Sequence, residues 1–353
     1  MKKILVVDDS SFARKILSKI ISDIGFDVDT ASDGEEALKK VFSQNYDLIT
    51  LDMEMPGISG IEVLKQIMGK KPTRVIIISS FTTDNADLTF EALNLGALTY
   101  ITKPGRLGVD LKKIEERIKT KIVEIINIPE DKILPARRSY HSELNKTYRS
   151  RYENNQKFIF IGASTGGPKH IEDLVKVLPF NYPHPVCIVQ HMPSEFISKF
   201  VRRLDSISSI KVVEAKDGEV LEGGKVILGK GNYHLTFDKN AGNIVCRLKP
   251  DMDNSLFVPS IDKMFISALK VIEPEKIIGI LLTGIGSDGA EGLLKMKKSG
   301  ALTISESEET AVVYGMPKKA YEIGGVSKKL SFPQILNFLI SIGDEKDVQK
   351  IQS

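Results

Sequence analysis

The residues best suited to chemistry stand directly after short apolar runs of the chain. In the second half, the run 158–161 stops at the motif Gly162-Ala163-Ser164-Thr165-Gly166. A Gly-x-Ser-x-Gly turn between a strand and a helix exposes the serine hydroxyl at the start of the helix, which is how many hydrolases present a nucleophile. We therefore predict that Ser164 is the nucleophile of a serine hydrolase.

A serine hydroxyl needs a base, and five histidines are available. His191 is favoured because it directly follows the apolar run 186–189 and Gln190. His234, in Gly231-Asn232-Tyr233-His234, is its main competitor. The carboxylate that fixes the imidazole tautomer is best supplied by Asp288, which follows the strongest apolar run of this half. For Asp288 the alternative is a helix N-cap before Ala290.

A second group of chemical residues, built from acids, lies in the first third of the chain. Asp8 and Asp9 follow the run 3–7, and Asp52 follows the run 48–51. Three carboxylates at one edge of a sheet would repel each other, so we predict a Mg²⁺ site. Asp52 would then accept a phosphoryl group while Asp8 and Asp9 hold the metal. The alternative for Asp8 and Asp9 is capping of the next helix.

Two further side chains complete this acidic group. Ser79 follows the run 75–78, and Lys103 follows the run 98–101. Lys103 would pair with the phosphoryl oxygens and Ser79 would donate a hydrogen bond to one of them. A hydroxyl and a lysine at successive strand ends, beside the aspartates, favour phosphoryl chemistry over simple capping.

The elements that must position these residues alternate between strands and helices. In the first part, candidate strands at 3–7, 27–30, 48–51, 75–78 and 98–101 predict a doubly wound, parallel five-stranded α/β domain. Phe12, Ile16, Ile20 and Ile24 suggest the buried face of its first helix. In the second part, candidate strands at 158–161, 186–189, 225–228, 277–282 and 301–304 predict another α/β domain with a mainly parallel sheet.

These patterns predict domains at residues 1–125 and 157–345, joined by a linker at 126–156. The linker loses apolar periodicity and carries the basic residues Lys132, Arg137, Arg138, Lys146, Arg149 and Arg151. It is either a solvated flexible connector or a basic strip that docks an acidic partner. The sequence does not separate these two interpretations.

Composition narrows the class of protein. The chain has 353 residues, a formal net charge of +3 and 42% hydrophobic residues, as in ordinary globular proteins. This charge gives no argument for nucleic-acid binding, and no apolar run is long enough to span a membrane. Cys187 and Cys246 are far apart in sequence, which disfavours disulfides and cysteine zinc sites. We expect a cytoplasmic protein without membrane insertion.

Residues 1–125 resemble the response-regulator receiver domain. The resemblance rests on Val7-Asp8-Asp9-Ser10, on Leu51-Asp52-Met53-Glu54-Met55-Pro56-Gly57, on Ser79-Ser80 and on Lys103-Pro104. It implies that Asp52 is phosphorylated by a histidine kinase. It also implies that Tyr100 is the aromatic residue whose rotamer responds to Ser79; the alternative is an ordinary strand residue.

The second domain resembles the chemotaxis protein-glutamate methylesterases. The resemblance rests on the Ser164 turn, on Gln190-His191-Met192-Pro193, on Pro259-Ser260-Ile261-Asp262, on Thr283-Gly284-Ile285-Gly286-Ser287-Asp288-Gly289-Ala290 and on Val313-Tyr314-Gly315-Met316-Pro317. It implies a glutamate methyl ester on the cytoplasmic helices of a chemoreceptor as substrate, and deamidation of receptor glutamines. It also places oxyanion donors at the backbone of Thr165 and Ile285, and implies no cofactor for ester hydrolysis.

The sequence departs from this family at several positions. Ile285 replaces a usual Met, Gly229-Lys230-Gly231 replaces Ala-Pro-Gly, and Glu306-Ser307 replaces Gln-Asp. A backbone donor survives the first change, so the departures put only peripheral substrate contacts in doubt.

Together these features predict a phosphorylation-regulated serine hydrolase that demethylates chemoreceptors, with a chemotaxis histidine kinase as phosphodonor. We expect the unmodified first domain to restrict access to Ser164. The alternatives are a phosphorylation-gated hydrolase for another ester or amide, and a non-catalytic two-component regulator. A transcription factor is disfavoured because no basic recognition helix follows the linker.

Overall fold

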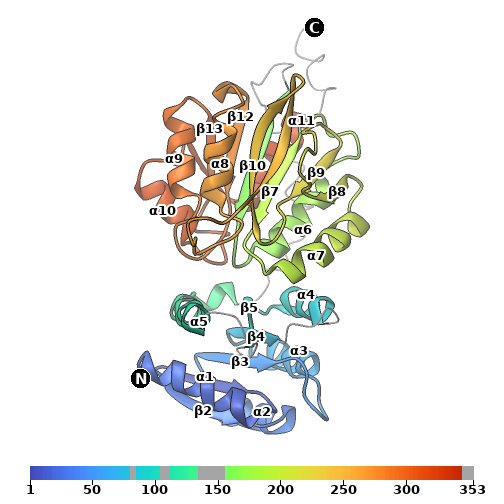
Figure 1. Ribbon diagram of the computed structural model, residues 1–353. Helices are drawn as coiled ribbons and strands as arrows, with labels where there is room; N and C mark the ends of the chain where they lie inside the picture. The colour runs from blue at the N-terminus through green and yellow to red at the C-terminus, as the bar shows by residue number, and fades with distance from the viewer. Residues whose placement is uncertain (80–84, 104–110, 134–155, 344–353) are drawn as a thin grey trace. The chain divides into compact units, whose positions relative to one another are not determined.

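The computed structural model describes residues 1–79, 85–103, 111–133 and 156–343 (Figure 1). The chain divides into two compact units, Met1–Arg137 and Arg138–Ser353. Residues 134–155 of the predicted linker, with His141 and most of its basic residues, lie outside the described residues.

The first unit is a parallel sheet with the strand order β2-β1-β3-β4-β5, which confirms the predicted architecture. Its strands are β1 (Lys3–Val7), β2 (Asp27–Ala31), β3 (Leu48–Asp52), β4 (Val75–Ser79) and β5 (Thr99–Thr102). Its helices are α1 (Ser11–Asp23), α2 (Gly34–Ser43), α3 (Gly60–Lys70), α4 (Asn85–Leu95) and α5 (Leu111–Ile125). Every residue of β3 and β4 is buried, as expected for inner strands of a sheet that helices cover on both faces.

The predicted buried face of α1 is only partly right, because Ile20 is buried but Phe12, Ile16 and Ile24 are not. Phe12 is 67% exposed, and the buried residues of the helix are Ala13, Leu17, Ile20 and Ile21. A strict four-residue repeat drifts around a helix of 3.6 residues per turn, whereas the 13, 17, 20, 21 spacing stays on one face. This leaves Phe12 beside the acidic residues but outside the core.

The first residues of the predicted linker pack against the first unit. Ile126, Ile128 and Ile133 are buried. Lys2 Nζ donates to the carbonyl oxygen of Ile126 at 2.9 Å, and the Arg74 guanidinium donates to that of Ile128. A short 3₁₀ turn, η1 (Glu130–Lys132), follows. This stretch is therefore ordered on the first unit.

The second unit contains a seven-stranded sheet in the order β14-β13-β12-β6-β7-β9-β8, with every neighbouring pair parallel. Its strands are β6 (Phe158–Ala163), β7 (Val186–Gln190), β8 (Lys211–Glu214), β9 (Lys225–Leu228), β12 (Ile277–Leu281), β13 (Leu302–Glu306) and β14 (Lys328–Leu330). Its helices are α6 (Gly167–Val177), α7 (Ser194–Ile207), α8 (Ile261–Ala268), α9 (Ala290–Lys298), α10 (Met316–Glu322) and α11 (Phe332–Gly343), with the 3₁₀ turn η3 (Pro274–Lys276) before β12. The mainly parallel sheet is confirmed.

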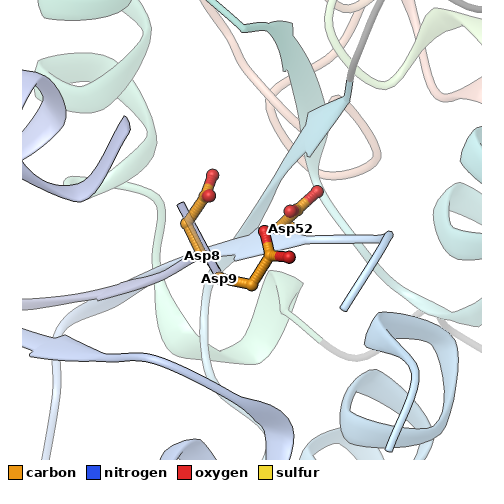
Figure 2. Close-up of side chains that lie close together, drawn as sticks. All are labelled: Asp8, Asp9 and Asp52. Carbon is orange, nitrogen blue, oxygen red and sulfur yellow. The ribbon is translucent and has the colours of Figure 1, made fainter. Parts of the chain in front are cut away.

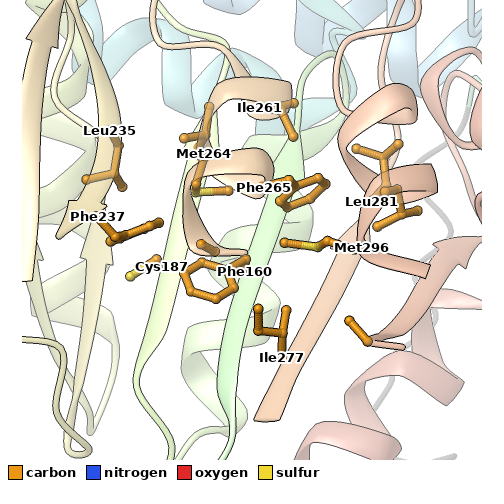
Figure 3. Close-up of a cluster of buried hydrophobic side chains, with 14 of the residues drawn as sticks. Phe160, Cys187, Leu235, Phe237, Ile261, Met264, Phe265, Ile277, Leu281 and Met296 are labelled. Carbon is orange, nitrogen blue, oxygen red and sulfur yellow. The ribbon is translucent and has the colours of Figure 1, made fainter. Parts of the chain in front are cut away.

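A separate antiparallel hairpin, β10 (Tyr233–Asn240) and β11 (Asn243–Pro250), covers part of this sheet. Figure 3 shows how Leu235 and Phe237 of the hairpin face Cys187 and Phe160 of the sheet, beside Met264 of α8. The rings of Phe160 and Phe237 lie 5.0 Å apart. Sheet, hairpin and the helices α8 and α9 thus share one core, and its packing fixes the N-terminus of α8.

The two cysteines, which are distant in sequence, are both buried in this core and both free. Their side chains interact, and burial together with that interaction raises the pKa of the Cys187 thiol. Cys187 is a core residue, as predicted. Among the described residues, no helix is both long and apolar enough to cross a lipid bilayer.

Candidate functional site

The topology of the second unit brings three predicted residues to one edge of its sheet. β6 lies between β7 and β12, so the strand order reverses at this point. Crevices at such reversals, beyond the carboxyl ends of parallel strands, are the usual binding sites of α/β sheets. Ser164 follows β6, His191 follows β7, and Asp288 lies in the loop after β12. All three therefore lie at the same edge of the sheet.

The turn at Ser164 is fixed by backbone hydrogen bonds on both sides. Ser164 N donates to Thr283 O at 3.0 Å, and Gly167 N donates to Ser164 O at 2.9 Å. Gly166 has a φ of 81°, and an added Cβ there would lie 2.6 Å from Val312 Cβ. Only glycine fits this left-handed turn, which ends β6 and starts α6 directly after the serine.

His191 and Asp288 form a direct contact. His191 Nε2 lies 2.8 Å from Asp288 Oδ2, and both side chains are largely buried. Because the carboxylate accepts, Nε2 carries the proton, and Nδ1 is left as the basic nitrogen. Nδ1 is buried and has no hydrogen-bond partner among the described residues. The ring also stacks on Phe257, with 4.1 Å between centroids and 5° between planes, which restricts its rotation.

The N-terminus of α8 binds the Asp288 carboxylate. Ser260 Oγ donates to Oδ1 at 2.9 Å, Ile261 N donates to Oδ2 at 2.7 Å, and Asp262 N donates to Oδ1 at 3.0 Å. Burial acts to raise the pKa of Asp288, but the bonds from His191 and from these backbone groups lower it to about 2. The carboxylate therefore stays ionised and can stabilise a charged imidazole.

Asp262 is the second acid at this helix start. Its Oδ1 accepts from Gly292 N at 2.6 Å. Burial raises the pKa of Asp262 to about 6; the bond from Gly292 opposes this shift, and the neighbouring charge of Asp288 adds to it. At the same helix end, the pKa of Asp262 is therefore raised and the pKa of Asp288 is lowered.

Ser164 and His191 are neighbours, but the structure contains no hydrogen bond between their side chains. Residues Ala163 and Gln190, directly before them, are partners in the β6–β7 register, and His191 N donates to Ala163 O at 3.0 Å. The two residues therefore leave adjacent strands at the same level. Catalytic hydrogen bonds are often open before substrate binds, so the proton transfer from Ser164 to His191 stays a prediction.

The predicted oxyanion donors also lie at this edge. For the peptide N–H groups of Thr165 and Ile285, no acceptor is found among the described residues. A Cβ added to Gly284 would lie 2.7 Å from Ser164 Cβ, so the loop that carries Ile285 contacts the serine. Two free N–H groups beside the nucleophile are what an oxyanion requires, and their role stays a prediction.

The competing histidines have structural partners. His234 Nδ1 accepts from Ser260 N at 3.1 Å, and its Nε2 lies 3.2 Å from Asp251 Oδ1. His170 contacts Glu306, and His184 contacts the Ile342 carbonyl oxygen at 2.8 Å. His234 therefore supports the helix start that binds Asp288, and His191 is the histidine that pairs with Asp288.

Glu306, one of the departures from the family pattern, is fully buried. Its Oε1 lies 2.9 Å from His170 Nε2, and its Oε2 accepts from Thr283 N at 2.8 Å. Thr283 Oγ1 in turn donates to Thr165 O at 2.9 Å. The expectation of a peripheral substrate contact does not fit this burial; Glu306 supports the loops around Ser164 from inside the domain.

Sequence reasoning did not single out Ser260, Phe257 or Glu306 for these roles. Ser260 had a readable signal, because a serine before Ile261-Asp262-Lys263 is typical of a helix N-cap, and its Oγ does accept from Lys263 N at 3.3 Å. Phe257 had none, since its stacking partner is distant in sequence.

In the first unit the predicted acids also meet. Carboxylate oxygens of Asp8, Asp9 and Asp52 all lie within 4.8 Å of one another (Figure 2). They lie beyond β1 and β3, where the strand order of this sheet reverses. Oxygen-only donors in a cluster of three acids, with Asp8 and Asp52 buried, fit a hard divalent cation such as Mg²⁺.

Lys103 completes this acidic site. Its Nζ lies 2.6 Å from Asp52 Oδ2 and 3.1 Å from Asp8 Oδ2. Burial raises the pKa of Asp52 to about 6; Lys103 opposes this shift, and the charge of Asp8 adds to it. Burial acts to lower the pKa of Lys103, yet its bonds to Asp52 and Asp8 raise it overall. The ammonium group of Lys103 is therefore charged and lies beside the carboxylates of Asp52 and Asp8.

Ser79 ends β4, the strand next to β3 and Asp52, and Tyr100 lies one strand farther out, in β5. Ser79 is buried at the end of β4, and Thr89 Oγ1 lies 3.4 Å from its hydroxyl oxygen. Tyr100 is buried in β5, and Lys121 Nζ lies 5.2 Å from its ring centroid. Both residues are placed as predicted, and their switch roles stay predictions.

Comparison with known proteins identifies both units. The response regulator receiver domain model matches residues 4–118, and the CheB methylesterase model matches residues 159–339. The chain belongs to the CheB methylesterase family. A relative from Carboxydothermus hydrogenoformans, named protein-glutamate methylesterase/protein-glutamine glutaminase 2, is 40% identical over 348 residues and covers 96% of this chain and 98% of its own.

Further members of the family agree. A relative from Thermotoga maritima, named protein-glutamate methylesterase/protein-glutamine glutaminase, is 38% identical over 330 residues, which are 91% of this chain and 93% of its own. The crystal structure of the Thermotoga maritima CheB methylesterase catalytic domain is 36% identical, with a TM-score of 0.51, and covers 54% of this chain and all of that domain. The resemblance found in the sequence is confirmed.

Proposed function

We propose that this protein is a phosphorylation-regulated protein-glutamate methylesterase that hydrolyses glutamate methyl esters on chemoreceptors, with Ser164, His191 and Asp288 as its catalytic triad. The observation that carries this proposal is the 2.8 Å contact between His191 and Asp288 at the sheet edge where Ser164 starts α6. Membership of the family supports the substrate class, and the geometry of the site supports the reaction mechanism.

Ser164 Oγ attacks the ester carbonyl carbon as its proton passes to His191 Nδ1. Asp288 accepts a hydrogen bond from the Nε2–H of His191 and stabilises the imidazolium. The peptide N–H groups of Thr165 and Ile285 donate to the oxyanion. The C–O bond to the methoxy group then breaks, and His191 gives its proton to the departing methoxide, which leaves as methanol.

Water then hydrolyses the acyl-enzyme formed on Ser164, and His191 again acts first as a base and then as an acid. His191 takes a proton from water, the hydroxide attacks the acyl carbon, and the proton returns to Ser164 Oγ as glutamate leaves. A glutamine side chain follows the same steps with ammonia as the leaving group, which accounts for a glutaminase activity of the same site. This chemistry needs no cofactor.

Phosphorylation of Asp52 controls this activity. Asp8 and Asp9, together with Asp52, would hold Mg²⁺, which neutralises the charge of the transferred phosphoryl group when it is bound. Lys103 pairs with the phosphoryl oxygens, Ser79 donates to one of them, and the Tyr100 ring responds to Ser79. A chemotaxis histidine kinase is the phosphodonor, and the receptor helices place the enzyme in the cytoplasm.

The alternative function is a hydrolase that acts on a different ester or amide. It would use the same triad, so only a comparison of substrates can separate it from a receptor methylesterase. The test is methanol release from methylated receptor, measured with and without a small phosphodonor and Mg²⁺, beside a panel of unrelated methyl esters. We expect receptor methanol release that rises on phosphorylation. Equal turnover of unrelated esters would contradict the receptor substrate, and no turnover at all would favour a non-catalytic regulator.

A further inference from the structure

The side-chain amide of Gln190 contacts the backbone of both the proposed nucleophile and the proposed base. Gln190 is the last residue of β7 and is only 2% exposed. Its Nε2 donates to the carbonyl oxygen of Ser164 at 2.9 Å and to that of His191 at 3.0 Å. One primary amide therefore bridges the peptide groups of the two residues that must exchange a proton.

This bridge continues the sheet beyond its last backbone bond. The β6–β7 register ends at Ala163 and Gln190, and the final backbone link is His191 N to Ala163 O at 3.0 Å. After this point the chain turns into α6 on one side and toward α7 on the other. Among the described residues, the amide of Gln190 is what ties the Ser164 carbonyl to the His191 carbonyl.

The oxygen atom of the Gln190 amide indicates that a glutamine is needed at this position. Gln190 Oε1 is buried and has no hydrogen-bond partner among the described residues. A buried polar atom without a partner is unfavourable, and an apolar side chain would avoid it. Gly167 makes room for this oxygen, because a Cβ there would lie 2.2 Å from Oε1. The neighbouring backbone is therefore shaped around the amide.

We propose that Gln190 is a positioning residue that sets the distance between the Ser164 hydroxyl and the His191 imidazole through its two backbone hydrogen bonds. The inference rests on the proposed function only in requiring that these two residues react. It predicts that Gln190 acts on the rate of acylation of Ser164 and leaves substrate binding unchanged.

Two variants of the full-length protein test this role. Gln190→Met keeps the length of the side chain and removes both donors. Gln190→Glu keeps the shape, but when ionised it turns a carboxylate oxygen toward two carbonyl oxygens. When protonated it can donate one hydrogen again. Tyr182→Phe is the matched control, because it removes a buried bond of 2.8 Å from a side chain to the Leu339 carbonyl oxygen, away from the triad.

The readouts are kcat and KM for methanol release, and the rate at which a fluorophosphonate labels Ser164, which needs no receptor. A misplacement of about 1 Å at a reacting pair can cost on the order of 100-fold in rate. We expect Gln190→Met to lose about tenfold to 100-fold in kcat and in labelling rate, with KM within about twofold. Tyr182→Phe should keep both rates even where its melting temperature falls equally.

The pH dependence separates positioning from a general structural effect. The ratio of Gln190→Glu to wild-type labelling rates should rise as pH falls, because burial favours the protonated acid. The same ratio for Gln190→Met should stay flat. If Gln190→Met does not fold, the pH dependence of Gln190→Glu decides alone.

Labelling of Gln190→Met at the wild-type rate, a change in KM alone, or a flat ratio for Gln190→Glu would each overturn the inference while leaving the proposed function intact. Absence of Ser164 labelling in the wild-type protein would overturn both.

Discussion

His191 and Asp288 meet through Nε2 and Oδ2 at 2.8 Å, and the same carboxylate oxygen accepts the backbone N–H of Ile261 at 2.7 Å. The acid that orients the base is therefore also the ligand of a helix N-terminus. This shared use restricts the imidazole, and the bonds from His191 and the backbone lower the pKa of the carboxyl group. If the proposed triad is right, the start of α8 positions its acid, and the first predictions depend on this coupling.

Replacing Asp288 with Asn should leave the fold in place but present an amide to His191, which no longer favours the Nε2–H tautomer. In serine triads this change costs about 10⁴ in kcat. We expect a loss of about three orders of magnitude or more in methanol release. Asp217→Asn is the control, because Asp217 lies on the surface of the same unit, where it pairs with Arg247 and accepts from Leu248 N. Similar losses in both variants would contradict a specific role of Asp288.

Ser260→Ala removes two contacts at once. Ser260 Oγ caps α8 and donates to Asp288 Oδ1. Loss of a cap costs about 1 kcal/mol in the free energy of unfolding, and loss of a donor to the catalytic acid should lower kcat by about tenfold. The matched control is Ser59→Ala, which removes the cap of α3 in the first unit. A Ser260→Ala enzyme with full kcat would show that α8 does not orient Asp288.

Asp262 should make the second unit less stable as pH rises. Its folded pKa of about 6 lies above the ordinary value of 3.8, so between these pH values the folded state binds more protons than the unfolded chain. Stability from this group is full below about pH 4 and is lost as pH rises through about 6, by about 3 kcal/mol at most. Asp262→Asn keeps an acceptor for Gly292 and should flatten this dependence.

Urea unfolding of the full chain at pH 4 to 7, followed by hydrogen exchange on peptides of α8, measures this effect. The free energy of unfolding of wild type minus that of Asp262→Asn should fall as pH rises from 4 and should change no further above neutral pH. A constant difference across the range would contradict the raised pKa.

Removal of divalent cations should separate the two sites. Chelation should lower phosphorylation of Asp52 by a small phosphodonor more than about tenfold, because the three clustered acids need a metal to accept another anion. Methanol release by the unphosphorylated enzyme should not change, since the triad uses no metal. Asp8→Asn should reproduce the first effect without chelator. A chelator-sensitive basal esterase would contradict this division.

Sequence patterns predicted all five strands of the first sheet and five of the seven strands of the second, but they missed β8 and β14. The candidate site residues could be predicted because they lie at the carboxyl ends of parallel strands. Asp8 and Asp52 directly follow short apolar runs, Ser164 follows such a run after Gly162-Ala163, and His191 follows one after Gln190. These runs are largely buried in the strands and can be recognised in the sequence. The residues that could do chemistry therefore stand where the predicted strands end.

What the sequence could not predict depends on contacts between distant segments. The burial pattern of the hairpin β10–β11 does not alternate strictly, so there was no clear strand signal in this part of the sequence. The contact of His234 Nδ1 with Ser260 N, at the start of α8, joins residues 26 positions apart. Glu306 reads as a strand-end acid, like the catalytic residues, yet its partner His170 lies 136 residues away and makes it a core residue. The face of α1 was misread because Phe12 is hydrophobic but exposed.

The central claim is that Ser164 attacks the substrate with the help of His191. Methylated receptor is mixed with wild-type, Ser164→Ala or His191→Gln enzyme; methanol release is followed, and rapidly quenched samples are examined by mass spectrometry for an acyl group on the enzyme. We expect wild type to release methanol and to carry the acyl group on Ser164, and both variants to lose several orders of magnitude in rate. Retention of methanol release by Ser164→Ala, or an acyl group at another residue, would contradict the account.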